Sequence, residues 1–255
     1  LNETILNTSN VNSNTFGKLF SLRVDGMIYA QPLYVPNVPI PGLGTHNVVF
    51  VCTEHNTVYA FDADSRSDSP LWSVNLGPPL PASIISSDRD IVNEIGITST
   101  PVIDLASNTI YVVAETYEDT EAIFRLHALD ISTGSEKFGG PAIIKGSVTG
   151  TSADSSDGVL TFFPLMQWQR PGLLLWNGRI YIGFGSHQDA QPYHGWIFAY
   201  DAVKLQQRAI RCLTPDGLAA GVWQGGVGLT VDADGNIYVQ TGHAQNVTEG
   251  VSLGD

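Results

Sequence analysis

VFVCTEHNTVYAFDAD, residues 49–64, is the stretch of sequence that decides the fold. Two short apolar runs, Val49–Val51 and Val58–Phe61, flank a polar cluster at Thr53–Asn56. The runs are too short for helices and are rich in β-branched and aromatic residues, so they predict two strands joined by a turn. The pair is either a local hairpin or one copy of a larger repeat.

The same pattern returns along the chain at a nearly constant period. Three markers recur in order: a proline or glycine ahead of a strand, an aromatic residue inside an apolar run, and an aspartate that closes the next run. The prolines lie 69 and 70 residues apart and the aspartates 68 and 71. The markers are Pro32, Pro101, Pro171 and Gly228; Phe50, Tyr111, Tyr181 and Tyr238; and Asp62, Asp130 and Asp201. Self-similarity at a fixed period predicts stacked or radially arranged units.

Each unit predicts four short strands. In the second unit these are Pro101–Asp104, Thr109–Ala114, Phe124–Ile131 and Lys137–Ile144. Turn signals such as Asn177-Gly178 join the first two strands of a unit, because this dipeptide tolerates positive φ. Four-stranded antiparallel sheets repeated around an axis form a β-propeller, so we expect an all-β propeller fold.

A shorter signature closes the third strand of each unit. It is Ala60–Ala63, followed by Trp72; Ala128–Asp130, followed by Thr133-Gly134; and Ala199–Ala202. With these residues the units resemble blades of the quinoprotein-type (PQQ-like) β-propeller family, whose blade motif is Ala-x-Asp, a Thr-Gly turn and a tryptophan. The resemblance covers the chain from about residue 16 onward. Within the family it points to a subgroup of secreted propeller proteins of mostly unassigned activity.

We expect a single, incomplete propeller domain. An N-terminal segment of about 1–30 precedes blades at 31–76, 100–145 and 170–213, and a partial blade occupies 225–255. With a repeat of about 70 residues, the 255 residues hold about three and a half blades. The resemblance implies seven or eight blades, so we interpret the sequence as a fragment and expect the remaining half of the propeller as a partner.

The charge balance argues against two classes of partner. The chain has 25 acidic and 12 basic residues, a formal net charge of −13, and its basic residues are scattered. Such a surface repels phosphate backbones, so we expect no nucleic-acid partner. No apolar run approaches the roughly 18 residues of a membrane span, and no such span is expected.

Two features bear on the compartment. The resemblance implies a secreted, periplasmic or cell-surface protein, and N-glycosylation patterns begin at Asn2, Asn7 and Asn246.

The chain has two cysteines, Cys52 and Cys212. We expect both to be unpaired and buried, with a disulfide between them as the alternative.

Strand order in a propeller assigns its loops to two ends. Connections between first and second or third and fourth strands are short here, as at 106–108, 132–136 and 177–178, apart from a Pro-rich excursion at Pro36–Asn47. The other connections are long. They comprise 77–99, 146–169 and 214–224 between units, and 116–122 and 186–195 within them. Function tends to reside in long loops on a rigid scaffold, so we place any site at this end, which we call the long-loop end.

The long-loop end holds the candidate ligand-binding residues. They are Glu94, His187, Asp189, Tyr193, His194, Trp196, Trp223 and Gln224. Their side chains are either contacts for a ligand or parts of well-folded loops. Trp223 and Trp168 are expected either to stack on a planar ligand or to pack between blades. The two histidines in 186–195 do not fit a zinc motif, so we assign no metal ligand and no catalytic residue.

Two acidic stretches have alternative interpretations. Asp88-Arg89-Asp90, with Glu94, forms either a calcium site or a solvated loop paired with Arg89. Asp232–Asn236 begins like a calcium-binding loop but lacks the later bidentate glutamate. Because a hairpin turn is required at that place in the repeat, we interpret Asp232–Asn236 as a turn.

Two functions compete at this point. The favoured one is a non-catalytic binding or scaffold module for a protein or a glycan, since aromatic residues in long polar loops suit stacking on sugars. They are Tyr117, Trp168, Tyr193, Trp196 and Trp223. The resemblance implies the alternative, a PQQ- and Ca-dependent dehydrogenase acting on alcohols or sugars. A glycan-cleaving enzyme is a third option, because propellers host several chemistries.

The resemblance also implies a set of features for such a dehydrogenase. A quinone stacks on a tryptophan, carboxylate and amide oxygens hold Ca²⁺, an aspartate acts as base, and two adjacent cysteines often form a ring over the cofactor. The two cysteines of this sequence are 160 residues apart, and no aspartate matches a base motif. These departures favour the binding module over the enzyme.

Overall fold

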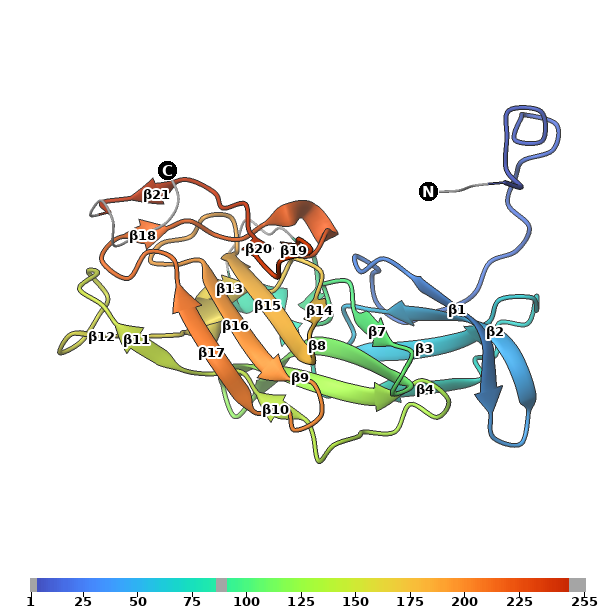
Figure 1. The fold of residues 1–255 in the computed structure, drawn as a ribbon, viewed down its shortest axis with the longest axis horizontal. Coiled ribbons are helices and arrows are strands. Elements are labelled where there is room, and N and C mark those ends of the chain that lie inside the picture. Colours follow the sequence, from blue (N-terminus) through green and yellow to red (C-terminus); the bar gives the residue numbers. More distant parts are fainter. Residues whose placement is uncertain (1–3, 86–90, 248–255) are drawn as a thin grey trace.

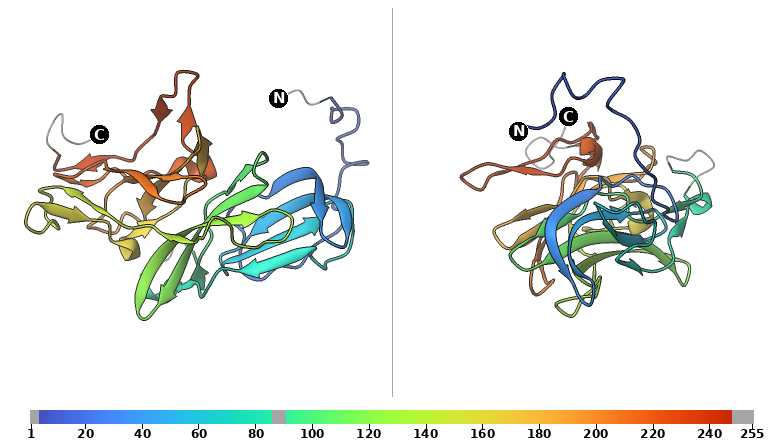
Figure 2. Two further views of the ribbon diagram at one scale, coloured as in Figure 1. Left: turned by 60° about the horizontal axis from the view of Figure 1, so that its bottom comes forward. Right: turned by 90° about the vertical axis from the view of Figure 1, so that its right-hand side faces the viewer.

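The chain folds into antiparallel four-stranded sheets that follow one another in sequence and lie side by side (Figures 1 and 2). The computed structural model describes residues 4–85 and 91–247. Helical structure in this part of the chain is limited to three single turns of 3-10 helix, η1 (Ala82–Ile84), η2 (Pro164–Met166) and η3 (Gln224–Gly226). The expected all-β class is therefore confirmed.

The first sheet contains the stretch 49–64. Its strands are β1 (Leu33–Ile40), β2 (Gly44–Cys52), β3 (Thr57–Asp62) and β4 (Trp72–Asn75), paired in sequence order. The stretch therefore forms the second and third strands of a four-stranded meander, with Thr53–Asn56 as their connection. It is one copy of a repeat and not an isolated hairpin.

The second and third sheets repeat the meander. The second contains β7 (Val102–Asp104), β8 (Thr109–Glu118), β9 (Glu121–Asp130) and β10 (Ala142–Ile143). In the third, β13 (Gln167–Trp168) and β14 (Leu174–Trp176) both pair with β15 (Arg179–Ser186), which is followed by β16 (Trp196–Asp201) and β17 (Gln207–Cys212). The remaining strands form short pairs: β5 (Leu80–Pro81) with β6 (Glu94–Ile95), β11 (Ser147–Thr149) with β12 (Val159–Thr161), β18 (Leu218–Ala219) with β21 (Ala244–Gln245), and β19 (Thr230–Val231) with β20 (Ile237–Tyr238).

The register of strand pairing makes the repeat markers equivalent. Each marker aromatic lies opposite an alanine of the next strand, in the pairs Phe50 with Ala60, Tyr111 with Ala128, and Tyr181 with Ala199. Each marker aspartate lies opposite the residue two positions before its aromatic, in the pairs Asp62 with Val48, Asp130 with Thr109, and Asp201 with Arg179. The three sheets are therefore copies of one unit in three dimensions.

Apolar residues from facing sheets form the core. Along β8, Ile110, Val112 and Ala114 pack towards the first sheet, while Tyr111 and Val113 pack towards the third. This two-residue alternation places every second side chain on each face of the strand. Because the second sheet is covered on both faces, β8 is apolar at consecutive positions instead of alternating with polar residues.

Trp72 docks the first sheet onto the second. Its indole Nε1 donates a hydrogen bond of 3.0 Å to the carbonyl of Ile131. Its ring lies over Gly134, where an added Cβ would come within 2.6 Å of a ring carbon. Gly134 also has a φ of 72°, a conformation that favours glycine. The Thr133-Gly134 turn of the blade motif is thus the surface that receives the tryptophan of the preceding blade.

The prediction of a long loop at 116–122 is wrong. β8 continues to Glu118 and β9 begins at Glu121, so the turn is only Asp119-Thr120. These two residues have φ values of 49° and 70°, as a two-residue hairpin turn of the primed type requires. The turn itself is exposed, and the half-buried Glu118 beside it binds Arg125 at 2.6 Å. This run of polar residues conceals the end of the strand in the sequence.

The prediction of a Pro-rich excursion at Pro36–Asn47 is also wrong. Pairing of β1 with β2 continues to Ile40 opposite Gly44, so most of the segment is a hairpin with a short turn. The prolines are tolerated because β1 is an edge strand and carries a bulge between Val35 and Val38.

The fourth strand of the second unit is shorter than Lys137–Ile144. An isolated bridge joins Glu136 to Leu129 of β9, but the strand itself is limited to Ala142 and Ile143, because Gly139, Gly140 and Pro141 interrupt the extended chain. The third-to-fourth connection therefore runs from 131 to 141 and is longer than the expected 132–136.

Two predictions about single sites are confirmed. Cys52 and Cys212 are free and buried, and burial raises the pKa of each thiol to about 12. Asp232–Asn236 is the turn between β19 and β20, with Asp232 Oδ1 accepting from the backbone N–H groups of Asp234 and Asn236. Hydrogen bonds from Asn236 and Tyr238 lower the pKa of Asp232 to about 2.

Candidate functional site

Polar side chains from several segments meet between the sheets at the long-loop end. Glu54 and Asn56 come from the β2–β3 connection, Thr98 from the connection between the first two sheets, Glu115 from β8, and Arg170 from the segment before β14. We call these five residues the polar junction. The first four are buried and Arg170 is half-buried.

Glu54 is held on one side only. Its Oε2 accepts hydrogen bonds from the Gly96 N–H at 2.7 Å and the Thr98 hydroxyl at 3.2 Å. Its Oε1 has no partner among the described residues. Burial raises the pKa of Glu54 to about 7, although these hydrogen bonds and the positive charge of Arg170 oppose the increase. The carboxyl therefore keeps its proton to a higher pH than an exposed glutamate does.

Glu115 is the equivalent residue of the second sheet, since each glutamate lies four positions after its marker aromatic. Neither of its carboxyl oxygens has a partner in the described part of the chain. Burial and the negative charge of Glu54 raise the pKa of Glu115 well above its ordinary value. Asn56 bridges the two units by donating to the Glu115 carbonyl at 2.6 Å, while its own Oδ1 is unpaired among the described residues.

A series of aromatic contacts leads from the polar junction to the 186–195 loop. The Trp168 indole donates to the Thr98 hydroxyl at 3.1 Å, and its ring stacks on His187 with centroids 5.5 Å apart. Trp223 packs edge-on against both Trp168 and Tyr193, at 6.5 and 6.4 Å. Burial lowers the pKa of His187 to about 4, so its imidazole is neutral at neutral pH.

The third sheet has a glycine where the first two sheets have their buried glutamates. Gly185 lies four positions after Tyr181, and an added Cβ there would come within 2.8 Å of the Trp223 ring. Trp223 thus fills the space that a third carboxyl would otherwise occupy. The polar junction is therefore confined to the first two sheets and their neighbours.

The fold has been seen before in a solved structure. The quinohemoprotein alcohol dehydrogenase ADHIIG from Pseudomonas putida HK5 matches 89% of this chain with a TM-score of 0.55 and 16% sequence identity. The chain has the fold of part of a quinoprotein-type propeller. A europium-containing methanol dehydrogenase matches 79% of the chain, with a TM-score of 0.42 and 15% identity.

This chain is much shorter than either protein. It spans 30% of the alcohol dehydrogenase chain and 28% of the methanol dehydrogenase chain. No known family profile matches the sequence. No curated protein is similar enough in sequence to be matched.

The predicted site residues are distributed over the long-loop end of the sheets. Glu94 pairs with His55 Nδ1 at 3.0 Å, and its negative charge contributes to the raised pKa of Glu54. Asp189 accepts a hydrogen bond of 2.5 Å from the Tyr193 hydroxyl. Gln224 donates to the Gly228 carbonyl at 3.1 Å. Glu94 therefore borders the polar junction, and His187 and Trp223 connect to it through Trp168.

Two of the predicted aromatic contacts are unavailable to a ligand in this structure. Tyr193 and Trp196 are 1% and 0% exposed, so their rings are structural and offer no surface on which a sugar could stack. Trp168 and Trp223 remain half-buried but pack on each other and on the neighbouring blades. Packing between blades, one of the two alternatives for these tryptophans, accounts for their contacts.

Some residues predicted from the sequence lie outside the described residues or are exposed near the ends of the chain. Asn2 and Asp88-Arg89-Asp90 lie outside the described residues. Asn7 and Asn246 are exposed.

The main residues of the polar junction are not among those that the sequence predicts. Glu54, Asn56, Thr98 and Glu115 did not stand out, because each lies beside an apolar run and belongs to no known motif. A signal was nevertheless present. Aligning the units on Phe50 and Tyr111 places both glutamates at the same position of a strand end, where a repeated apolar core gives no reason for an acid.

The oxygen atoms of the polar junction can be compared with the ligands preferred by Ca²⁺, the metal ion that the resemblance implies. The unpaired oxygens of Glu54, Asn56 and Glu115 are of the carboxylate and amide type that Ca²⁺ prefers. Among the described residues, no group of three or more His, Cys, Asp or Glu side chains is placed to hold a metal ion. Two carboxyls and one amide oxygen are donors whose chemistry fits a hard cation.

The cysteines do not fit the cofactor ring that the resemblance implies. Cys52 lies in β2 of the first sheet and Cys212 in β17 of the third, each buried in its own core. These two residues cannot form a ring of adjacent cysteines over a bound quinone.

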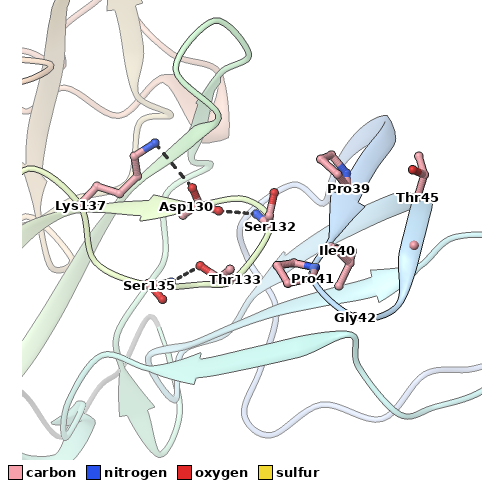
Figure 3. Close-up of a pocket in the computed structure, with 11 residues that line it drawn as sticks. Pro39, Ile40, Pro41, Gly42, Thr45, Asp130, Ser132, Thr133, Ser135 and Lys137 are labelled. Carbon is pink, nitrogen blue, oxygen red and sulfur yellow. Dashed lines mark hydrogen bonds and ion pairs between the residues drawn. The ribbon is translucent and has the colours of Figure 1, made fainter.

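A wide groove lies at the opposite end of the sheets (Figure 3). It has a volume of about 750 Å³ between the β1–β2 hairpin tip, with Pro39 and Pro41, and the turn that follows β9. Its polar groups bind one another, as in the 3.7 Å contact of Lys137 with Asp130. The buried polar atoms left unpaired at the polar junction have no counterpart in this groove, so we place the candidate site at the long-loop end.

No helix in the described part of the chain is long and apolar enough to cross a membrane.

Proposed function

We propose that the chain is part of a secreted, periplasmic or cell-surface propeller that acts as a binding module for a glycan or protein at its long-loop end. The supporting observation is a concentration of buried polar atoms without partners among the described residues. They are Glu54 Oε1, Asn56 Oδ1, Ser99 Oγ, both carboxyl oxygens of Glu115, Gln169 Oε1 and Ser186 Oγ.

Such atoms are costly when nothing binds them. Each buried unpaired polar group destabilises a fold by about 1–3 kcal/mol, and native proteins keep few of them. Because these groups are almost fully buried, we infer that ordered water completes their hydrogen bonds and links them to a ligand at the half-buried Trp168 and Arg170. Two carboxyls with raised pKa values add hydrogen-bond donors to a set of acceptors, which suits a ligand rich in hydroxyl and amide groups.

A glycan array followed by calorimetry tests this proposal on the purified protein. We expect affinity for the best glycan or glycoprotein ligand to fall about tenfold or more in Glu115→Gln and in Arg170→Gln, because a tenfold loss corresponds to one good polar contact. Arg211→Gln, which changes an exposed arginine of β17, is the matched control. Unchanged affinity in both junction variants would reject the polar junction as the binding site.

A PQQ- and Ca-dependent dehydrogenase acting on alcohols or sugars is the second candidate. Two observations favour it: the fold is shared with a quinohemoprotein alcohol dehydrogenase, and Glu54, Asn56 and Glu115 present oxygen donors that suit Ca²⁺. The quinone would supply the site that accepts the electrons of the alcohol. This chain would contribute the oxygens that hold the cation and the charge of Arg170 beside them.

Denaturing extraction and mass spectrometry separate the two candidates. A quinone recovered at about one per chain, together with calcium that is lost in Glu115→Gln, would support the dehydrogenase. No quinone after incubation with quinone and Ca²⁺ would eliminate it and leave the binding module.

A further inference from the structure

A separate cavity opens beside the 186–195 loop. It has a volume of about 350 Å³ and lies between the β11–β12 hairpin and that loop. Its walls include Asp154, Val159, Thr161, Phe163, Pro192 and Trp196. The volume lies at the lower end of the range for small-molecule sites, which suits a single ring and not a large cofactor.

One wall of the cavity carries a fixed carboxylate. Both oxygens of Asp154 lie 3.1–3.2 Å from His194 Nε2, and Oδ1 accepts a hydrogen bond of 2.8 Å from Ser152. Burial raises the pKa of Asp154, but the hydrogen bonds from Ser152 and His194 outweigh it and lower the pKa overall. The side chain remains 28% exposed, so the carboxylate is held in one orientation while still facing the cavity.

Hydrogen bonds at both ring nitrogens of His194 hold this carboxylate in place. Its Nδ1 faces the carbonyl and the hydroxyl oxygen of Thr214 at 3.0 and 3.1 Å. That hydroxyl gives its own proton to the Ala219 carbonyl, so both groups can only accept from Nδ1. Because Nε2 faces the carboxylate, the ring makes hydrogen bonds on both sides, and it is buried with 3% of its side chain exposed.

The accessible walls beside the carboxylate are apolar. Phe163 is 56% exposed and Val159 is 45% exposed, although both are large apolar residues. Phe163 also borders a second hollow of about 460 Å³, on whose walls lie Ile143, Ile144 and Leu165. The phenyl ring thus lies between two hollows and presents an open aromatic surface.

The fixed carboxylate and the exposed apolar walls together determine which class of ligand the cavity suits. A cation finds a single carboxylate among the lining residues, and Ser152 and His194 already bond to it. An anion is repelled by the exposed carboxylate, and a purely apolar ligand would bury that carboxylate without a hydrogen bond, which is costly. A neutral sugar fits both features, since its hydroxyls donate to the carboxylate while its C–H face covers an aromatic ring.

We propose that this cavity binds a neutral pyranose unit, with Phe163 against the apolar face of the sugar and Asp154 accepting its hydroxyl hydrogen bonds. The second hollow gives room for an adjoining unit of the same glycan on the other side of the ring. This inference rests on the proposed binding role of the long-loop end and names the ligand class at a place distinct from the polar junction.

The test is calorimetric titration of the purified protein with cellotriose, maltotriose and chitotriose. At least one neutral trisaccharide binds, and Asp154→Asn and Phe163→Ala each weaken it tenfold or more. Phe163→Trp retains binding because it preserves the aromatic surface. Asp157→Asn, an exposed aspartate of the same hairpin, is the matched control and binds as the unmodified protein does.

Folding does not obscure the result, because Phe163 is largely exposed and its truncation leaves no cavity in the core. The inference is overturned if none of the three sugars binds, or if a sugar binds equally well to Phe163→Ala and Asp154→Asn. In either case the proposed function still stands if another ligand is lost in Glu115→Gln and Arg170→Gln. It fails as well if those junction variants bind every ligand unchanged.

Discussion

At the scale of single residues, the buried carboxyl of Glu54 makes stability depend on pH. Its pKa is about 7 in the folded chain against an ordinary 4.5, so its stabilising proton is fully bound below pH 4.5 and is lost as the pH rises to about 7. The cost of ionising it in the fold approaches about 3 kcal/mol above that pH.

We therefore expect Glu54→Gln to raise the unfolding temperature at pH 8, by on the order of 5 °C, and to have a much smaller effect at pH 4.5. Thermal unfolding followed by circular dichroism at the two pH values measures this. Glu121→Gln, at the exposed start of β9, serves as the control. An identical effect of Glu54→Gln at both pH values would contradict the assignment of a raised pKa.

Tyr111 provides a second prediction at this scale. Its hydroxyl donates to the Ala202 carbonyl at 2.9 Å and so links the second sheet to the third. Tyr111→Phe leaves a buried carbonyl without its partner, and we expect a loss of about 1–3 kcal/mol in the free energy of unfolding. Urea denaturation measures the loss, with the half-buried Tyr181→Phe as the equivalent change in the third sheet. A stability equal to that of the unmodified protein would show that this hydrogen bond does not join the sheets.

At the scale of elements, the Thr133-Gly134 turn receives Trp72, and two glycines allow that contact to be isolated. Gly134 and Gly139 have φ values of 72° and 73°, but an added Cβ meets the Trp72 ring only at Gly134. Both alanine variants therefore pay the same backbone strain, and only Gly134→Ala displaces the indole.

We expect Gly134→Ala to destabilise the chain by about 2 kcal/mol more than Gly139→Ala, as overpacking of a tight contact does. The fluorescence emission of Trp72, isolated by comparison with Trp72→Phe, should shift to longer wavelength in Gly134→Ala only. Equal stabilities of the two alanine variants would exclude docking through this turn.

Some of the strands could be predicted from the sequence, whereas the end of β8 and the polar junction could not. The strands of 49–64 and their copies were predictable because short apolar runs, a fixed period and Asn-Gly turns all indicate the same meander. The end of β8 was not predictable, because polar residues beside an exposed hairpin turn resemble a loop. The polar junction was not either: Glu54 and Glu115 become buried only when neighbouring sheets stack, which is a tertiary effect.

At the scale of the whole molecule, the face-to-face stacking of the sheets accounts for both the core and the candidate site. It buries Phe50 and Tyr111 along the middle of the strands, and it encloses Glu54 and Glu115 at the strand ends of the same two sheets. The repeat alone predicted the stacking. Which end carried the unpaired polar atoms emerged only from the arrangement of loops from three sheets.

The most direct test of this arrangement is a carboxyl ¹³C NMR titration of the protein, with Glu54 and Glu115 assigned from their glutamine variants. Stacked sheets predict a midpoint near pH 7 for Glu54 and one well above 4.5 for Glu115, and the Glu115 midpoint falls when Glu54 is replaced by glutamine. Two independent midpoints near 4.5 would mean that both carboxyls are solvated, and would contradict the stacking of the sheets and the site built on it.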